Sequence, residues 1–325
     1  MKIHDIGGEF ALIGRLASQS STTHPDLVTG IGDDAAVIGG SFPDGDYLLV
    51  TTDMLVEACH FRRDWATPAQ VGIKSVACNV SDIAAMGGTP TFMFVSLVLT
   101  ADTEVAWVET LYQGMAEACR RYGVVLAGGD TTLGEVTAVS ITLLGRVSPE
   151  NLRLRSHARP GELLCVTGPL GGSAAGLAML AAGLDPPDYL REKHLSPGCR
   201  LDVSPAIAPV ARAMIDISDG LAAEVNHICD QSGTGAEIIA ADIPIHPAVR
   251  KAARLTGNDP IAFALSGGED FELLFSITPE NKRLLEEKGI SVTAVGRVTE
   301  GTSNRVLTLP DGKRRTLSGG YNHFS

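Results

Sequence analysis

Short aspartate motifs recur along the sequence, and each places a carboxylate beside glycine, serine or threonine. Several carboxylates that converged on one spot would repel one another, and bound cations would relieve the repulsion and attract a polyphosphate. Magnesium takes oxygen ligands and is commonly shared between carboxylates and substrate phosphates. The motifs therefore indicate a divalent-metal site for a phosphate-bearing ligand. They cover residues 30–34, 51–53, 81–82, 128–132, 216–220 and 266–270.

A purely structural explanation also exists for each motif taken alone. Aspartate and glycine are ordinary turn residues, Asp219 could simply begin a helix whose dipole suits its charge, and Asp82 could be an exposed helix residue. Repetition argues for a site. Three motifs directly follow an apolar strand, after Val50, Ala127 and Ile215, and strand ends are where α/β folds present ligand groups.

Other phosphate-binding signatures are missing from the sequence. It contains no GxxxxGK[ST] loop, which excludes a P-loop in its usual form, and no protein-kinase motifs. The glycine turn at 168–173 could cradle a phosphate at a helix N-terminus. Tight packing is the favoured explanation for its glycines.

Strands and helices alternate along the chain, which predicts a mixed α/β fold. Thr67 and Pro68 form a good helix start, and the apolar stripe that follows ends at Gly87. A polar segment at 148–160 predicts a boundary between two domains, 1–150 and 151–325. The expected helices cover an opening stretch that contains 10–16, then 67–86, 104–122, 171–182 and a stretch after 220. The expected strands cover 47–50, 91–99, 124–127, 136–147, 163–167, 213–217, 271–277 and 292–298.

Composition excludes several classes of partner. The net charge of -12 leaves no general basic footprint for nucleic acid and no basic membrane-surface helix. The chain lacks a run of about 18 apolar residues that would span a membrane, and its first residues lack a signal-peptide core. Six widely spaced cysteines without a CxxC pair favour free thiols in a reducing cytoplasm over zinc or disulfides.

Six ordered motifs closely resemble the thiamine-monophosphate kinases, and the match runs from about residue 5 to the closing 320–324. The resemblance implies a two-domain fold shared with aminoimidazole ribonucleotide synthetase, with an N-terminal sheet that pairs across a homodimer and a C-terminal α/β domain. It also implies phosphorylation of thiamine monophosphate to thiamine diphosphate by ATP with several Mg²⁺ ions. The residues that carry it are 30–37, 51–61, 79–88, 128–131, 217–221 and 266–273.

Site roles follow from the resemblance, position by position. The metal ligands it implies are Asp33, Thr51, Thr52, Asp53, Asp82, Asp130, Asp216 and Asp219. The ATP contacts it implies are Tyr112, Gly129, Asp130, Arg146 and Ser218. The thiamine contacts it implies are His60, Glu269 and Tyr321. Because the acceptor phosphate is already ionised, charge neutralisation should matter more than any acid or base, and no catalytic acid or base is expected.

Three positions depart from the family pattern, and other functions remain as alternatives. Ala58 and Cys59 stand where glycine and valine are usual, and Tyr321 replaces a frequent tryptophan. Selenophosphate synthetase needs an early reactive cysteine and the hydrogenase maturation factor a C-terminal one, so both fit poorly. Aminoimidazole ribonucleotide synthetase lacks the paired aspartates in this form. A non-catalytic nucleotide- and metal-binding module is the alternative from another class.

Overall fold

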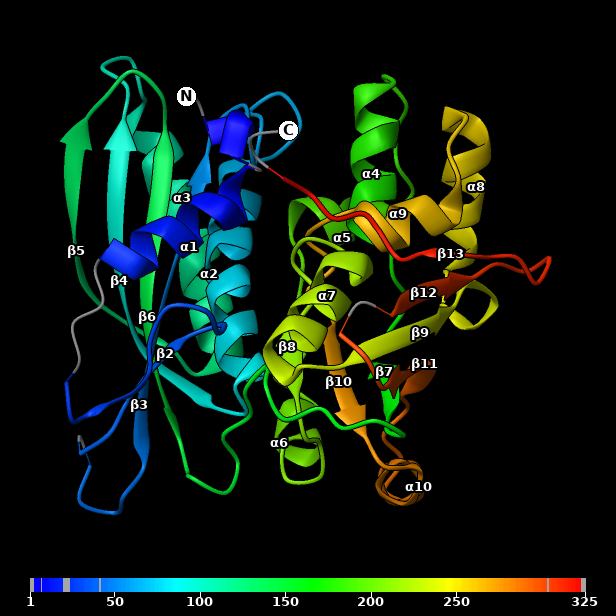
Figure 1. The fold of residues 1–325 in the computed structure, drawn as a ribbon. Coiled ribbons are helices and arrows are strands. Elements are labelled where there is room, and N and C mark those ends of the chain that lie inside the picture. The colour runs from blue at the N-terminus through cyan, green and yellow to red at the C-terminus, as the bar shows by residue number, and fades with distance from the viewer. Residues whose placement is uncertain (1–2, 7, 20–23, 41, 303, 323–325) are drawn as a thin grey trace.

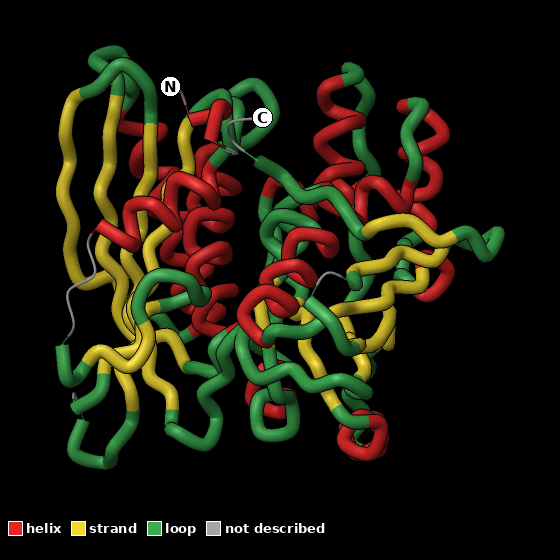
Figure 2. The backbone as a smooth tube through the Cα atoms, in the orientation of Figure 1, coloured by secondary structure: helices red, strands yellow, loops and turns green. Residues whose placement is uncertain are grey.

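The structure is a computed structural model that describes residues 3–6, 8–19, 24–40, 42–302 and 304–322. The last two residues of the family match, His323 and Phe324, therefore lie outside the described part of the chain. Over the ranges that it describes, the fold contains two β-sheets with helices packed against each (Figure 1, Figure 2). The expected mixed α/β class with two sheets is confirmed.

The first sheet belongs to the N-terminal half and has six strands within the described residues, in the order β1-β2-β3-β6-β4-β5. Helices α2 and α3 pack on one of its faces, where Leu49, Ile83 and Leu143 are fully buried. A short 3-10 helix (Ile3–Ile6) and α1 (Glu9–Gln19) precede it. The elements of this half are β1 (Leu27–Thr29), β2 (Ala36–Ile38), β3 (Tyr47–Val56), α2 (Pro68–Ala85), β4 (Thr89–Leu99), α3 (Val105–Tyr122), β5 (Val125–Leu133) and β6 (Ala138–Val147).

Helix α2 begins and ends where the sequence predicts. The Thr67 hydroxyl accepts a hydrogen bond from the backbone N–H of Gln70, and the Gln70 side chain accepts one from the Thr67 N–H, which makes a capping box. Gly87, with φ +72°, follows the helix end. The helix packs so closely on α3 that a Cβ added to Gly114 would lie 2.0 Å from the carbonyl oxygen of Ala69.

Two strands are longer than the sequence predicts. β3 runs on to Val56 and β5 runs on to Leu133, so the aspartates at 53 and 130 lie inside strands and not in turns after them. Both strands continue because they are paired along their whole length, β3 with β6 and β5 with β4. Strand alternation, not turn geometry, therefore decides where these two side chains point.

The second sheet has seven strands within the described residues, in the order β13-β12-β9-β11-β7-β10-β8. Its pairs are antiparallel except β12 with β9. The elements are β7 (Leu163–Val166), α4 (Gly172–Ala181), α5 (Asp188–Leu195), α6 (Ser204–Ile207), β8 (Met214–Asp216), α7 (Leu221–Ser232), β9 (Gly235–Ile239), a 3-10 helix (Ala240–Asp242), α8 (Pro247–Thr256), α9 (Pro260–Ser266), β10 (Leu273–Ile277), α10 (Pro279–Glu287), β11 (Thr293–Thr299), β12 (Arg305–Thr308) and β13 (Arg314–Thr316).

Helix α2 lies between the first sheet and the second half of the chain (Figure 1). The segment after β13 returns from the second sheet towards the N-terminal helices (Figure 1), where the Asn322 side chain lies beside Gly8. On this path the backbone N–H of Tyr321 donates to the carbonyl oxygen of Asp219 at 2.9 Å. Among the described helices, none is both long and apolar enough to cross a membrane.

Candidate active site

Three carboxylates from distant parts of the sequence meet between the two sheets. Oxygen atoms of Asp34, Asp82 and Asp216 all lie within 4.8 Å of one another. Asp34 comes from the turn before β2, Asp82 from α2, and Asp216 from the end of β8. We call these three residues the acidic centre. Only Asp216 occupies the strand-end position that the sequence predicts for its motif.

Neighbouring side chains hold the acidic centre in place. The Thr51 hydroxyl, on β3, donates to Asp82 at 2.5 Å, and the Ser81 hydroxyl donates to Asp216 at 2.7 Å. Asp53 lies beside the centre on β3, and its backbone N–H donates to the Asn79 side chain at 3.2 Å. Thr51 and Asp53 are two residues apart on one strand, so both side chains face α2.

The charges of the acidic centre oppose one another strongly. Burial, and to a smaller extent the charge of Asp34, raise the pKa of Asp216 to about 8. Burial and the charge of Asp53 raise the pKa of Asp82 well above its usual value, and burial also raises the pKa of Asp34. The buried carboxylates therefore favour protons or metal cations over bare negative charge.

One oxygen of the centre has no hydrogen-bond partner among the described residues. It is Asp34 Oδ2, in a side chain that is only 1 % exposed. Its other oxygen accepts from the Arg155 guanidinium at 2.6 Å. An unsatisfied buried carboxylate oxygen is costly, and among oxygen-rich surroundings it fits a hard cation such as Mg²⁺.

Asp33 and Asp34, adjacent in one motif, have different partners. The Asp33 carboxylate accepts from the backbone N–H of Arg155 at 3.2 Å, so it anchors the interdomain segment. Burial and, second, the charge of Asp34 raise the pKa of Asp33 to about 7. The structure thus brings Asp34, which the sequence-based set omits, into the acidic centre, and it places Asp33 beside Arg155.

Ser218 and Asp219 lie in the turn before α7. The backbone N–H of Asp219 donates to Glu224 at 2.9 Å, and the Ser218 hydroxyl is 3.5 Å from the same carboxylate. Burial raises the pKa of Glu224 well above its usual value, and the charges of Asp216 and Asp219 add to the shift. Glu224 is therefore a further buried acid at this end of the site.

Thr52, Gly129 and Asp130 lie apart from the acidic centre. Thr52 alternates with Thr51 and Asp53 and is exposed on the other face of the sheet. Gly129 on β5 lies opposite Val95 on β4, Val95 lies opposite Ile141 on β6, and Ile141 lies opposite Asp53 on β3. Three strand spacings therefore separate Gly129 from Asp53, which corresponds to about 14 Å. Asp130 is exposed on the edge strand β5.

Arg146 and Tyr112 also lie outside the acidic centre. Arg146 pairs in register with Leu48, five residues along β3 from Asp53, which corresponds to roughly 16 Å. Its guanidinium bonds Asp44 at 2.6 Å and lies over the Phe42 ring. Tyr112, on α3, is half-buried and lines a cavity of about 650 Å³ beside the start of β5.

The three residues implied for thiamine binding lie on three separate segments. His60 follows β3, and its Nδ1 accepts from the Val56 N–H at 3.0 Å, so this nitrogen carries no proton. Glu269 lies in the loop between α9 and β10 and has φ +64°. Its carboxylate is held by the Lys74 ammonium at 2.6 Å. Tyr321 is 45 % exposed on the returning C-terminal segment.

The glycine turn at 168–173 is already occupied by a protein carboxylate. Asp270 accepts from the backbone N–H groups of Gly171 at 2.6 Å, Gly172 at 2.9 Å and Ser173 at 3.3 Å. A Cβ on Gly168 would lie 2.6 Å from Glu272. Packing therefore accounts for these glycines, and the N-terminus of α4 is closed by Asp270.

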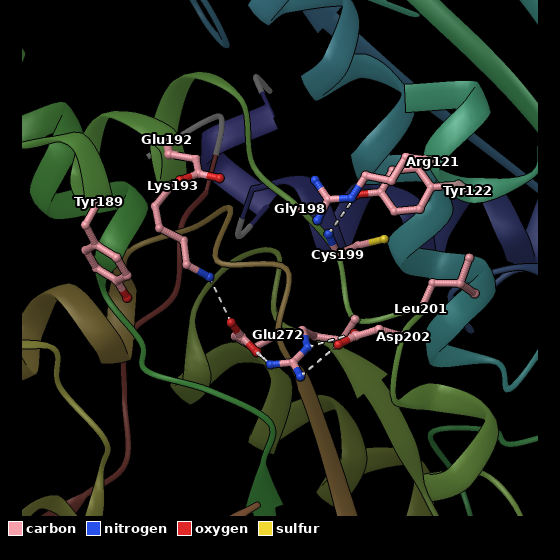
Figure 3. Close-up of a pocket in the computed structure, with 11 residues that line it drawn as sticks. Arg121, Tyr122, Tyr189, Glu192, Lys193, Gly198, Cys199, Leu201, Asp202 and Glu272 are labelled. Carbon is pink, nitrogen blue, oxygen red and sulfur yellow. Dashed lines mark hydrogen bonds and ion pairs between the residues drawn. The ribbon is translucent and has the colours of Figure 1, made fainter. Parts of the chain in front are cut away.

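A second charged cluster borders a cavity of about 500 Å³ between α5 and the end of α3 (Figure 3). The Glu272 carboxylate accepts from Lys193 at 2.8 Å, from Arg200 at 3.1 Å and from the Thr167 hydroxyl at 2.8 Å. Figure 3 shows the Lys193 side chain reaching down from its helix to Glu272. This carboxylate is fully satisfied, unlike that of Asp34.

Three residues at the site escape recognition by sequence motif: Asp34, Lys74 and Arg155. Asp34 is hidden by its neighbour, because a pair of aspartates does not reveal which one points inwards. Lys74 interrupts the apolar face of α2, and a lone lysine in such a stripe is the available signal. Arg155 belongs to the basic run of the interdomain segment, which stands out in an acidic chain.

Comparison with known proteins gives a consistent assignment. Residues 32–147 match the family described as AIR synthase related protein, N-terminal domain, and residues 159–308 match its C-terminal domain. Thiamine-monophosphate kinase of Bacillus subtilis is 35% identical and covers 97% of this chain and 99% of its own. That of Mycobacterium tuberculosis is 38% identical over 98% of this chain and 92% of its own.

The same relationship appears in three dimensions. A solved structure described as AaThiL complexed with AMPPCP and TMP superimposes with a TM-score of 0.87 at 34% identity. The match covers 100% of this chain and 99% of the other.

Proposed function

The chain belongs to the family of thiamine-monophosphate kinases, and we propose that its acidic centre supports the transfer of a phosphoryl group from ATP to thiamine monophosphate. A phosphate oxygen of thiamine monophosphate attacks the γ-phosphorus, the bond from that phosphorus to the bridging oxygen breaks, and ADP leaves with its electron pair. The products are thiamine diphosphate and ADP.

The observation that supports this proposal most directly is the convergence of three carboxylates with one unpaired oxygen. Mg²⁺ ions, when bound, would neutralise the anionic phosphates of both substrates. Asp34, Asp53, Asp82 and Asp216 are the residues that we propose to hold them. Asp219 and Asp33 are proposed to complete the set at its two ends. Since the Thr51 hydroxyl holds Asp82 and Thr52 faces away, any metal contact of these two threonines involves main-chain oxygens.

The chain's own residues position the two anions and do not transfer protons. The acceptor phosphate is ionised near neutral pH, so it needs no strong base. In-line approach of two anions is the difficult step, and it is helped by fixed, preorganised charge. We propose that Arg155, whose guanidinium already contacts the acidic centre, orients ATP there together with Ser218. Arg146 is the less suitable arginine because Asp44 and Asp46 occupy it.

The position of Asp130 supports a homodimer. If Asp130 and Gly129 bind ATP or metal, as the family resemblance implies, they cannot reach the acidic centre of their own chain across about 14 Å of sheet. They lie on the exposed edge strand β5. Phe92 and Phe94 on the neighbouring strand β4 are 49% and 42% exposed. We propose that this apolar surface pairs with a second copy, and that Asp130 of each copy serves the other's site.

Subunit complementation tests the shared site. Asp53→Asn and Asp130→Asn variants should each be inactive alone. Mixed dimers formed by refolding the two together should regain activity, because one of their two sites contains no substitution. Dimers that remain inactive, with each variant folded, would show that both aspartates serve the same chain. Asp64→Asn, an exposed surface change, controls for the effect of mixing and refolding.

The reaction itself is tested by following product. Purified protein with ATP, Mg²⁺ and thiamine monophosphate should form thiamine diphosphate and ADP in equal amounts, seen by ³¹P NMR. Protein that binds ATP and forms no thiamine diphosphate would favour the non-catalytic binding module. We also propose domains at 1–150 and 151–325 and a cytoplasmic location, since Cys78, Cys119, Cys165, Cys199 and Cys229 are free and buried.

A further inference from the structure

A buried lysine joins the two halves of the molecule beside His60 and Glu269, the residues that the family resemblance gives to thiamine recognition. Lys74 lies on α2 with its side chain only 3% exposed. Its ammonium donates to the carbonyl oxygen of His60 at 2.9 Å and to the Glu269 carboxylate, whose two oxygens lie 2.6 and 2.7 Å away. These two partners are separated by more than half of the sequence. His60 lies in a loop of the first sheet, after β3, and Glu269 lies in a loop of the second sheet, before β10.

Burying an ammonium is costly unless its N–H groups are paired. Lys74 has three donors, and contacts with three oxygens satisfy them. Its position is therefore fixed by the same two residues that the family resemblance gives to thiamine recognition. Fixing the ammonium in this way fixes the separation of the His60 segment and Glu269.

Two further neighbours of Glu269, His194 and Ser173, are neutral at pH 7. Burial lowers the pKa of His194 to about 4, and the charge of Lys74 lowers it as well. The Ser173 hydroxyl is 3.0 Å from His194 Nδ1 and 3.4 Å from Glu269. Since that hydroxyl has one proton and donates it to Glu269, His194 donates to Ser173. Lys74 thus supplies a fixed positive charge in direct contact with this carboxylate.

Part of the Glu269 side chain remains accessible to a ligand. Its side chain is 25% exposed, and its backbone has φ +64°, a conformation that is strained for a residue with a side chain. Burial opposes the ionised form, but the Lys74 charge holds the pKa of Glu269 below its usual value. The carboxylate is charge-balanced and rigid, so it suits the acceptance of a directed hydrogen bond.

We propose that Lys74 is a positioning residue for the thiamine side of the site. It holds the Glu269 carboxylate, already neutralised by a fixed ammonium, so that its accessible part accepts hydrogen bonds from an exocyclic amine of the aminopyrimidine ring. The proposal rests on the proposed function and on the thiamine-binding roles that the family resemblance implies for His60 and Glu269. It predicts that Lys74 acts on thiamine monophosphate recognition through Glu269 and leaves ATP recognition alone.

A double-mutant cycle with Lys74→Met and Glu269→Gln tests this coupling. Loss of one charge-assisted hydrogen bond weakens binding by about 10- to 100-fold. Lys74→Met should therefore raise the KM for thiamine monophosphate by about 10- to 100-fold, with the KM for ATP changed by less than about threefold. Lys74→Arg, which retains the charge, should recover part of the loss.

The double variant K74M/E269Q separates positioning from mere stability. It removes both charges together, so it leaves no orphaned buried ion and should fold even where K74M does not. Its KM for thiamine monophosphate should equal that of Glu269→Gln within about threefold, since Lys74 has nothing left to position. A KM that is the product of the two single effects, or an equal rise in the KM for ATP, would overturn the proposal.

Lys193→Met provides a matched control, because Lys193 also pairs with a buried carboxylate, Glu272, at 2.8 Å but outside the proposed site. It should lower the melting temperature with both KM values unchanged. A rise in the KM for thiamine monophosphate in this variant equal to that in K74M would also overturn the proposal. Wild-type protein in the same assay separates the test of the kinase function from the test of the role of Lys74. Wild-type protein that forms no thiamine diphosphate would refute the kinase function itself.

Discussion

Removal of one charge from the acidic centre should stabilise the metal-free protein while it abolishes activity. Asp216 has a pKa of about 8 against a usual 3.8. At pH 7 this difference corresponds to a penalty of about 4 kcal/mol for the folded state, if Asp216→Asn relieves all of it. The Asn oxygen still accepts from Ser81, and its NH₂ group can donate to Asp82 or Asp34. We therefore expect a gain of about 2–4 kcal/mol.

The sign of the pH dependence follows from the raised pKa. Between the unfolded value near 4 and the folded value near 8, the native state binds more protons than the unfolded state. The wild-type protein should therefore become more stable as pH falls from 9 to 6. Asp216→Asn lacks this group, so its advantage should be largest near pH 9 and should shrink towards pH 6.

Thermal unfolding in EDTA, at intervals from pH 6 to 9, measures both effects. A gain of 1 kcal/mol corresponds to about 2–4 °C in a domain of this size, so the melting temperature should rise by several degrees. Addition of Mg²⁺ should reverse the order, because metal stabilises the form that binds it. The matched control is Asp44→Asn, an exposed carboxylate paired with Arg146, which should change stability by less than about 1 kcal/mol.

Two results would refute the reasoning. An Asp216→Asn variant that is less stable than wild type in EDTA at pH 8 would show that the carboxylate is not under electrostatic strain. A variant that gains stability and still binds Mg²⁺ with wild-type affinity would show that Asp216 does not hold the metal.

Three further predictions concern metal binding and two backbone positions. Mg²⁺ binding at pH 7 should release protons from the protein, because Asp34, Asp82 and Asp216 have raised pKa values. Calorimetry in buffers of different ionisation enthalpy measures this proton release, and binding without it would contradict the raised pKa values. Ala58→Gly should stabilise the protein by about 1 kcal/mol in urea unfolding, because Ala58 has φ +67°; a destabilised variant would contradict the strain. Gly114→Ala should cost about 1–3 kcal/mol in the same assay, because its Cβ would meet the Ala69 carbonyl; unchanged stability would contradict the close approach of α2 and α3.

Much of the fold follows from local patterns in the sequence. Helix α2 is specified by its Thr67–Gln70 capping box, its apolar stripe and its terminal glycine, all of which act within a few residues. The mixed α/β class and the position of the segment between the two sheets also follow from local composition. The lengths of β3 and β5 do not, because each extra residue is ordered by a partner strand distant in sequence.

The site divides in the same way. From the sequence alone, the aspartates near glycine and serine predict a divalent-metal and phosphate site, and the resemblance gave the reaction. Tertiary structure decided that Asp34 and not Asp33 joins Asp82 and Asp216. It also decided that Arg155 and not Arg146 lies among the aspartates. The direction in which a side chain points depends on strand alternation and on contacts between domains. A single sequence motif specifies neither of these.

Asp130 shows the limit most clearly. The sequence identifies its motif, but strand register places it about 14 Å from the acidic centre of its own chain. Lys74 shows the opposite: it belongs to no recognised motif, yet the fold places its ammonium in contact with both the His60 loop and the Glu269 loop. The sequence therefore determined which chemistry is present. Packing of α2 between the two sheets decided which residues share it, because side chains from distant segments meet only when the chain is folded.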